Sequence, residues 1–331
     1  MRIAVLYNTS EEAIKGKDSD RLADNEVLET ANAVKLALER RGHKATLQKV
    51  NDSLERLKEY DFVFNLAESV VGSDIEEYDI AKKMEDMNVP FTGSGPMALK
   101  ICMDKYATKK KLIELGLSTP MFELVPLGSA PAKKMNYPLI VKPVREDGSI
   151  GITEDSVVYD ALKLKAKVKE VHSLYRQAAL VEEYIDGREF NVAIIGNDET
   201  AEVMPVSEIV FDYPEGMPKI VSFDAKWLED SMVYKNSNGK CPADIDEDTE
   251  KKLSENARVA YKKTGCRDYG RVDFRLREGI PYILEVNPNP CINPNGAGLV
   301  RSANTRGMSY DVLINKILEV AENRYQSRSR R

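Results

Sequence analysis

The sequence contains little histidine and cysteine, and this excludes several kinds of active site. Its 331 residues include two histidines and four cysteines, and the cysteines form no closely spaced pair. A Ser-His-Asp triad, a histidine-ligated metal and a zinc-binding cysteine cluster are therefore not expected. The lack of a disulfide pattern favours a reducing environment, so we predict a cytoplasmic protein.

Long apolar runs and an excess of basic residues are also missing. No apolar segment approaches the length of a membrane span, and the apolar start at residues 3–7 is too short for a signal peptide. The net charge of −6 gives no basic footprint for nucleic acid. We therefore expect neither a membrane nor a nucleic-acid partner, and a chemistry that relies on Asp, Glu, Lys and Arg.

The first part of the chain alternates between short apolar runs and helical periodicity. This pattern predicts strands at 3–7, 45–50, 62–66 and 90–92, and helices at 25–41 and 75–87. Such alternation is typical of an open α/β unit with a parallel sheet, in which ligands bind at the carboxyl ends of the strands. Those ends are residues 8–10 and 65–72.

The remaining sequence shows no internal repeat and no low-complexity linker, so we expect closely packed domains. It predicts helices at 96–115, 159–175, 242–265 and 310–324, strands at 137–144, 179–184 and 189–195, and a hairpin at 269–290. We place the domains at 1–95, 96–185 and 186–325. The basic tail at 326–331 is predicted to be disordered, as short charged termini often are.

The hairpin at 269–290 has polar residues where a buried strand would not place them. Arg271 and Asp273 lie on its first run, and Glu285 and Asn287 lie on its second. If the connection is odd in length, Asp273 faces Glu285 across the pair. Arg271 then faces Asn287. Two carboxylates and an amide oxygen on one face suit Mg²⁺ beside substrate phosphates, whereas the alternative is a surface hairpin with solvated charges.

A second pattern follows the strand that ends at Lys142. Gly148 and Gly151 would let backbone N–H groups approach an anion, and Ser149 adds a hydroxyl donor. Lys142 could meet the same anion as a point charge. The spacing does not match the P-loop motif, and the alternative is a flexible surface hairpin.

A third pattern is a pair of acidic residues at the end of an apolar strand. Glu182 and Glu183 close this strand, and Glu189 follows after a glycine turn. Carboxylates accept hydrogen bonds from amino and hydroxyl groups, so they suit a nucleobase and a ribose. The alternative is a solvated strand edge.

A glycine-rich segment at 93–98 matches the dinucleotide-binding pattern Gly-x-Gly-x-x-Gly/Ala. It follows a predicted strand and precedes a predicted helix. However, that strand is the last of its domain rather than the first, and Glu114 lies inside a helical pattern instead of at the end of a second strand. A dinucleotide site is therefore disfavoured.

Taken in order, these motifs resemble the ATP-grasp superfamily, and most closely its D-alanine–D-alanine ligase branch. The resemblance extends over nearly the whole chain. It implies an α/β and α+β architecture, in which an N-terminal open parallel-sheet (pre-ATP-grasp) domain precedes a two-lobed ATP-grasp fold. The landmarks, in chain order, are Lys105, Lys142, residues 148–151, residues 182–185, Glu189, Lys226, Arg271, Asp273, Glu285 and Asn287.

The resemblance also implies a role for each of these residues. ATP would be bound by Lys105, Lys142, Gly148, Ser149, Glu182, Glu183, Tyr184, Ile185, Glu189 and Lys226. Mg²⁺, or Mn²⁺ in its place, would be held by Asp273, Glu285 and Asn287. The catalytic residues would be Arg271, Lys226 and Ser149, with Arg271 stabilising an oxyanion.

The implied activity is ATP-dependent ligation of a carboxylate to an amine through an acylphosphate. The partners would be small amino-acid or peptide substrates, and a homodimer is the family precedent. One alternative is an ATP-grasp phosphotransferase that forms no amide. Another is a catalytically silent nucleotide-binding regulatory module, which should have lost the metal ligands that this chain retains.

Two segments depart from the D-alanine ligase pattern. The family's His-Gly-x-x-Gly-Glu stretch is replaced by residues 65–72, which include Glu68. Its Ser-rich segment beyond the metal asparagine is replaced by residues 293–298, which end in Gly298 and precede Arg301. Glu68, Glu76 and Glu77 are the candidates for binding an amine and Arg301 for binding a carboxylate, with Gly298 beside it. The expected substrates are therefore amino-acid-like, and their identity is open.

Overall fold

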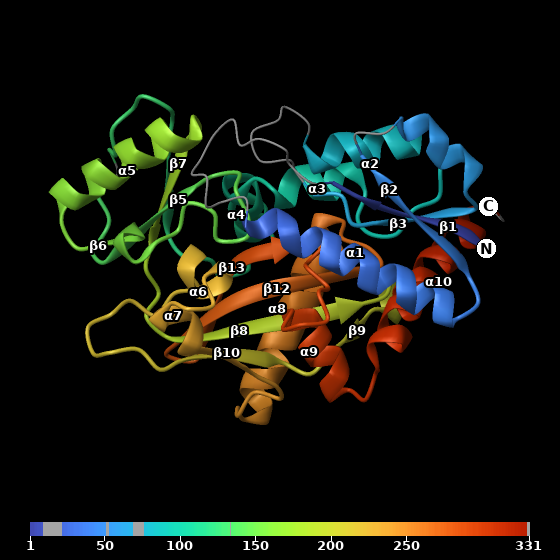
Figure 1. The fold of residues 1–331 in the computed structure, drawn as a ribbon. Coiled ribbons are helices and arrows are strands. Elements are labelled where there is room, and N and C mark those ends of the chain that lie inside the picture. Colours follow the sequence, from blue (N-terminus) through green and yellow to red (C-terminus); the bar gives the residue numbers. More distant parts are fainter. Residues whose placement is uncertain (9–21, 51–52, 69–75, 133, 330–331) are drawn as a thin grey trace.

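The computed structural model describes residues 1–8, 22–50, 53–68, 76–132 and 134–329, which form three sheets with flanking helices (Figure 1). One sheet is parallel and two are antiparallel, which confirms the predicted combination of α/β and α+β architecture. Each sheet lies within one of the predicted segments, and we retain those segments as proposed domain boundaries. Every helix in the described ranges is too short or too polar to cross a membrane.

The N-terminal sheet has the order β2-β1-β3, with all strands parallel. Its elements are β1 (Arg2–Tyr7), α1 (Leu22–Arg40), β2 (Lys44–Lys49), η2 (Leu54–Glu59), β3 (Phe62–Asn65) and α2 (Glu77–Asp86). As predicted, α1 ends just before Gly42, whose φ of +84° favours glycine. The predicted strand at 90–92 is reduced to one bridge between Val63 and Phe91, because Gly93 turns the chain with a φ of +91°.

The central sheet is antiparallel, with the order β4-β7-β5-β6. Its elements are α3 (Pro96–Cys102), α4 (Lys105–Glu114), β4 (Phe122–Val125), β5 (Leu139–Pro143), η3 (Glu154–Ser156), β6 (Val157–Val158), α5 (Ala161–Tyr175) and β7 (Ala179–Glu183). The predicted helix at 96–115 is two helices. The break occurs because the Asp104 side chain caps α4 by accepting a hydrogen bond from the Ala107 N–H at 2.9 Å.

The C-terminal sheet follows the order β11-β10-β8-β12-β13, with β9 paired to β8. Its strands are β8 (Arg188–Ile195), β9 (Glu202–Val203), β10 (Ser207–Phe211), β11 (Ser237–Lys240), β12 (Tyr269–Arg277) and β13 (Ile280–Asn287). Its helices are η4 (Asp198–Thr200), α6 (Phe223–Trp227), α7 (Met232–Lys235), α8 (Glu247–Thr264), α9 (Gly298–Thr305) and α10 (Tyr310–Ser329). Residues 326–329, predicted as a disordered tail, therefore continue the last helix.

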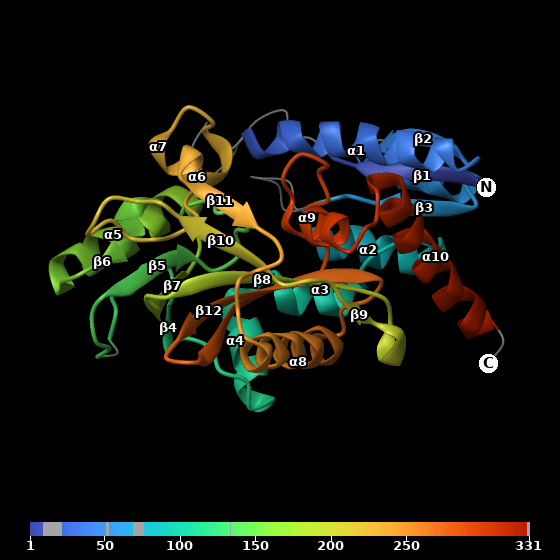
Figure 2. The ribbon, with the colours of Figure 1, turned by 90° about the horizontal axis from the view of Figure 1, so that it is seen from below.

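Alternate side chains of β8 enter two different cores. Val192 and Ile194 pack with α8, whereas Ala193 and Ile195 pack with α9, α10 and α1. Figure 2 shows α8 on one face of the sheet, with α9 and the N-terminal domain on the other. The N-terminal domain and the C-terminal lobe therefore share one apolar core, as the absence of a linker in the sequence suggested.

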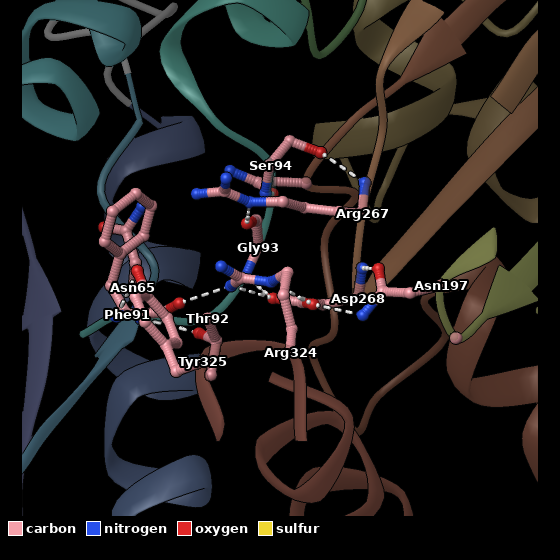
Figure 3. A network of polar contacts seen from close by, with 12 residues as sticks. Asn65, Phe91, Thr92, Gly93, Ser94, Asn197, Arg267, Asp268, Arg324 and Tyr325 are labelled. Atoms are coloured by element: carbon pink, nitrogen blue, oxygen red, sulfur yellow. Dashed lines mark hydrogen bonds and ion pairs between the residues drawn. The ribbon is translucent and has the colours of Figure 1, made fainter. Parts of the chain in front are cut away.

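A buried carboxylate also joins these two parts (Figure 3). The Asp268 side chain is fully buried and accepts hydrogen bonds from Arg324 at 2.9 and 2.7 Å. It also accepts from the Asn197 amide and from the Gly93 backbone N–H, each at 2.9 Å. Arg324 in turn donates to the Phe91 carbonyl at 2.8 Å. One aspartate thus links α10 and β12 to the end of the N-terminal sheet.

The same network accounts for the glycine-rich segment at 93–98. The backbone of Gly93 lies so close to the Asn289 side chain that a Cβ at this position would overlap with it. The Ser94 N–H donates to the Asn289 amide oxygen at 2.8 Å, and the Ser94 hydroxyl donates to the Pro288 carbonyl at 2.9 Å. These glycines and this serine allow close packing between domains, so no dinucleotide site is needed to explain the motif.

Candidate active site

A cavity of about 710 Å³ lies where the three sheets meet, a volume typical of small-molecule sites. Every site residue named from the sequence lines it except Glu76 and Glu77. These residues are Glu68, Lys105, Lys142, Gly148, Ser149, Glu182, Glu183, Tyr184, Ile185, Glu189, Lys226, Arg271, Asp273, Glu285, Asn287, Gly298 and Arg301. The fold therefore brings together side chains separated by more than two hundred residues, while their individual roles stay predictions.

The hairpin β12–β13 places its polar residues on one face by means of a bulge. The register pairs Asp273 with Glu285, as expected. It also pairs Arg271 with Asn287. This pairing does not arise from an odd connection, because the turn has two residues, both with positive φ. Leu284 is the extra residue of a β-bulge that shifts the register by one, and without it Glu285 would lie on the opposite face.

Asp273 is the most strongly bonded residue of this face. Arg271 binds its carboxylate through two nitrogens at 2.7 and 2.8 Å. The amide of Asn191 donates to it at 2.7 Å and that of Asn287 at 3.0 Å. Burial raises the pKa of Asp273, and the positive charge of Arg271 opposes this shift. Asn191 was not predicted, although it is the one polar residue in the apolar run of β8.

Glu285 lies near several positive charges. Burial acts to raise the pKa of Glu285, but the positive charges of Lys105, Arg271 and Lys142 lower it to about 2. The nearest of these is Lys105, whose ammonium lies 3.8 Å from the carboxylate. Glu285 is therefore a permanent anion beside Asp273, in a position suited to a hard cation.

The donor set of this face fits Mg²⁺. Among the described residues, no three His, Cys, Asp or Glu side chains converge as a metal cluster. The two carboxylates of Asp273 and Glu285 would be completed by the amide oxygen of Asn287 and by ligand oxygens. Mg²⁺ commonly binds in this way, through one or two carboxylates plus substrate phosphates. A half-turn of the Asn287 amide would direct its oxygen, rather than its nitrogen, toward Asp273.

Two lysines hold Glu182 at the opposite wall. The Lys142 ammonium lies 3.0 Å from one carboxylate oxygen, and the Lys109 ammonium lies 3.1 Å from the other. Lys109 is fully buried and also donates to the Thr119 hydroxyl at 2.8 Å. Burial acts to raise the pKa of Glu182, but the positive charges of the two lysines lower it. Sequence reasoning missed Lys109, which lies one helical turn after Lys105 within a run of three lysines.

Burial lowers the pKa of Lys109 to about 8, despite the attraction of Glu182. Lys109→Met is expected to raise the KM for ATP roughly 10-fold, because Glu182 then loses one of its two positive partners. In the native protein this KM should rise as the pH passes through about 8, where Lys109 loses its proton beside Glu182 and Lys142. Initial rates at varied ATP between pH 6.5 and 9.5 measure both effects.

The exposed neighbour Lys110 provides a matched control for this prediction. Lys110→Met should leave the KM for ATP and its pH dependence unchanged. A Lys109→Met protein whose KM still rises through pH 8 would show that another group causes the titration.

Glu189, expected at a ribose, is paired with an arginine that the sequence did not single out. The Arg275 guanidinium lies 2.6 Å from its carboxylate and donates to the Gly187 carbonyl at 3.0 Å. Burial raises the pKa of Glu189, and Arg275 opposes this. The sequence did contain a sign of Arg275: it alternates with Arg271 and Asp273 along β12, so the three side chains lie on the same face of the strand. At the cavity rim, Glu183 forms an ion pair with Arg277 at 2.9 Å.

The glycine loop lies against α6. Gly148 and Ser149 both have positive φ, +57° and +64°, which turns the loop back toward the cavity. The Ser149 hydroxyl donates to the Val221 carbonyl at 2.7 Å. The Trp227 indole donates to the Gly148 carbonyl at 2.8 Å, and the Lys226 ammonium lies 4.6 Å from the centre of the indole ring. The loop is thus held over the cavity by α6.

Trp227 is the only tryptophan in the chain, so its fluorescence reports on this contact. We expect Mg-ATP to change its emission intensity and maximum, because a phosphate near Lys226 would alter the charge beside the indole. A fluorescence titration with Mg-ATP measures this. Lys226→Met should reduce the change, whereas unaltered emission at saturating Mg-ATP would argue against nucleotide binding beneath the loop.

Among the remaining predicted residues, Glu68 lies just beyond β3 and is bound by a residue at the end of β1. The Asn8 side chain, at the end of β1, accepts from the Glu68 N–H at 2.7 Å and donates to its carbonyl at 2.8 Å. Asn8 and Glu68 follow the carboxyl ends of the parallel strands β1 and β3, where ligands were expected. The other residues of those predicted ends, 9–10 and 69–72, lie outside the described residues. Glu26 of α1 also lines the cavity and was not predicted, and its carboxylate accepts a hydrogen bond from the Cys291 thiol at 3.4 Å.

Comparisons with known proteins agree with this geometry. The family model described as "D-ala D-ala ligase C-terminus" matches residues 126–319. The chain is 36% identical over 307 residues to the uncharacterized protein y4sG of Sinorhizobium fredii, covering 89% of this chain and 88% of that protein. It is 32% identical over 312 residues to a D-alanine–D-alanine ligase of Cupriavidus taiwanensis, covering 91% and 89%.

A solved structure also resembles the fold. The D-alanine–D-alanine ligase of Bacillus anthracis, crystallised with ATP, superposes with a TM-score of 0.78 at 21% identity, and the match covers 99% of each chain. At this level of identity the likeness concerns the fold alone. The predicted fold class, an open parallel-sheet domain followed by a two-lobed ATP-grasp fold, is therefore confirmed.

Proposed function

The chain belongs to the D-alanine–D-alanine ligase family of ATP-dependent ligases, and from this premise we propose that it joins the carboxylate of one amino-acid-like substrate to the amine of another. The proposal includes Mg²⁺ as the metal, and a cytoplasmic homodimer as its setting. The activity is of the C–N ligase type. The substrates are proposed as small amino acids or short peptides, with D-alanine as the first compound to test.

One observation carries this proposal: the phosphate-type residues and the metal-type residues line the same cavity. Lys105 lies near Glu285 at 3.8 Å, so the predicted nucleotide and metal sites adjoin. Phosphoryl transfer depends mainly on positioning and on neutralising charge, which lysines and a carboxylate-bound cation supply. No nucleophilic side chain is needed, which agrees with the scarcity of histidine.

In the proposed reaction, the donor carboxylate attacks the γ-phosphate of ATP, so that an acylphosphate forms and ADP leaves. The amine of the acceptor then attacks the acyl carbon, and phosphate leaves from a tetrahedral intermediate. Lys105, Lys142 and Lys226 would neutralise the phosphates, and Arg271 would stabilise the oxyanion. The loop at Gly148 would exclude water, which would otherwise hydrolyse the acylphosphate.

The metal would be held by Asp273, Glu285 and Asn287. Bound there, Mg²⁺ supplies positive charge beside the transferred phosphoryl group. The chain's own contribution is the orientation of these ligands, because Arg271 and Asn191 fix the Asp273 carboxylate from two sides. Mn²⁺ is proposed as a substitute, since it favours similar oxygen ligands.

The proposal is tested by measuring ADP release with Mg-ATP and every D- and L-amino acid, singly and in pairs, and with dipeptides. A ligase releases ADP and phosphate together and gives a product whose mass equals the two substrates minus water. A phosphotransferase would instead give a stable phosphorylated product. ADP release with none of these substrates would contradict ligation of amino-acid-like compounds and favour a regulatory nucleotide-binding module.

A further inference from the structure

Most positive side chains that line the cavity are paired with a carboxylate of the protein. The pairs are Lys105 with Glu285 at 3.8 Å, Lys142 with Glu182 at 3.0 Å, Arg271 with Asp273 at 2.7 Å and Arg275 with Glu189 at 2.6 Å. Arg301 also lines the cavity and is partly buried, yet no described carboxylate lies within ion-pair distance of it. An unpaired guanidinium in a cavity wall is suited to an anionic ligand.

The hydrogen bonds of Arg301 leave one edge of its guanidinium open. Its Nε donates to the Ser207 hydroxyl at 2.8 Å, and its Nη1 donates to the Gly296 carbonyl at 3.2 Å. A guanidinium carries five N–H donors, and both donors on Nη2 lack an acceptor among the described residues. The side chain is therefore held in place by two protein contacts while a forked edge remains for a ligand.

One glycine makes room for this arrangement, and a second shows where it faces. A Cβ at Gly239 would overlap with the Arg301 guanidinium, so the arginine can hold this position only because residue 239 has no side chain. A Cβ at Gly298 would lie 3.6 Å from Nη2 of Arg301 and 3.6 Å from Cδ of Arg271. The free Nη2 edge therefore faces the start of α9, next to the arginine proposed to stabilise the oxyanion.

The surroundings make an anion favourable at this point. Burial lowers the pKa of Arg301, and Arg271 adds to this by repulsion. Arg271 is itself neutralised by Asp273, so Arg301 is the one of these two arginines without a counter-ion. A carboxylate bound to Nη2 would supply the missing negative charge and accept two charge-assisted hydrogen bonds.

We propose that Arg301 binds the carboxylate of the acceptor substrate, the molecule whose amine attacks the acylphosphate. This inference rests on the proposed ligase function. The donor carboxylate is converted into the acylphosphate, so a fixed cation cannot be its permanent partner. The acceptor carboxylate passes unchanged into the product, and a cation near Arg271 would hold it while its amine approaches the acyl carbon.

The bond changes define how this role can be tested. In the second half of the reaction a C–N bond forms, the C–O bond to phosphate breaks, and the amine releases a proton to solvent. Hydroxylamine can replace the acceptor in this step, giving a hydroxamate and phosphate. Because hydroxylamine has no carboxylate, its reaction should not need Arg301.

The experiment compares the full-length wild-type protein with Arg301→Met, Arg301→Lys and the control Arg306→Met, whose arginine is exposed just after α9. Rates are measured with Mg-ATP and D-alanine, or the best amino acid of the ADP-release screen, either as donor and acceptor or as donor with hydroxylamine. Arg301→Met should raise the acceptor KM about 10- to 100-fold, the range expected for lost hydrogen bonds to a charged group. Its hydroxamate formation and its KM for ATP should match the wild type.

The acceptor KM of Arg301→Lys should lie between those of the wild type and Arg301→Met, because lysine keeps the charge but lacks the forked edge of the guanidinium. Equal losses with the amino acid and with hydroxylamine would overturn the proposal and indicate a structural or donor-side role. An unchanged acceptor KM in Arg301→Met would also overturn it. If the wild type forms neither ADP nor hydroxamate with any amino acid, the ligase proposal itself fails, and this outcome is distinguishable from the other two. Thermal melting of each variant separates misfolding from loss of the contact.

Discussion

Glu285→Gln is expected to lower kcat by at least about 100-fold, because it removes a charge from the proposed metal-binding face without removing volume. The carboxylate cannot be neutralised by pH in a normal assay, since nearby positive charges lower the pKa of Glu285 to about 2. The substitution is therefore the direct test of this charge. Steady-state rates at saturating ATP, with Mg²⁺ varied over three decades, should show both a lower kcat and a weaker response to the metal.

The neighbouring Asp273 provides an informative comparison. Asp273→Asn should also abolish most turnover, but it would leave the partly buried Arg271 guanidinium without its bidentate partner. Removing one partner of a buried ion pair typically costs about 3–5 kcal/mol of unfolding free energy. We therefore expect Asp273→Asn to melt at a lower temperature, and Glu285→Gln to melt close to the wild type. Near-native turnover in both variants would refute the metal assignment.

Asp268→Asn is expected to lower the free energy of unfolding by about 3–5 kcal/mol. The fully buried carboxylate is the partner of Arg324 and binds the N-terminal domain through the Gly93 N–H. The amide would leave the Arg324 charge uncompensated. Urea denaturation followed by circular dichroism measures the change, and activity should persist at low temperature, because Asp268 does not line the cavity.

Asp61→Asn is the matched control, because Asp61 forms an exposed ion pair with Arg2 at 3.2 Å. Exposed pairs contribute little to stability because water and salt screen their charges, so this variant should unfold nearly as the wild type does. The double variant Asp268→Asn/Arg324→Met should be more stable than the sum of its single changes implies, because the uncompensated charge is gone. A cost below about 1 kcal/mol for Asp268→Asn would mean that the network does not hold the domains together.

The sequence predicted the elements of the fold because each has a local cause. Strong apolar periodicity located β1, β5, β8 and α8, and Gly42 marked the end of α1. Elements governed by distant contacts were less predictable. Residues 90–92 had the composition of a strand but form a single bridge, because the chain turns at Gly93 to bind Asp268. The bulge at Leu284 left no local signal that we recognised.

The functional site shows the same contrast between features with a local cause and features that depend on distant contacts. Lysines and carboxylates could be assigned to one site because their order along the chain resembles that of the ATP-grasp ligases, and strand parity indicated that Arg271 and Asp273 share one strand face. The partners of these side chains could not be predicted, because Lys109 and Glu182 lie 73 positions apart in the chain and meet only in the packed structure. Parity alone would have found Arg275, and the polarity of an otherwise apolar strand would have found Asn191.

The shared core between the two ends of the chain has a consequence for synthesis. Leu313, Ile314 and Ile317 of α10 complete the apolar layer that covers Val34 and Leu38 of α1. On a ribosome, the first domain therefore emerges early but stays without this layer until α10 has been made. Domains usually fold in the order in which they are translated. Here the first domain can reach its final packing only after both ATP-grasp lobes have been translated.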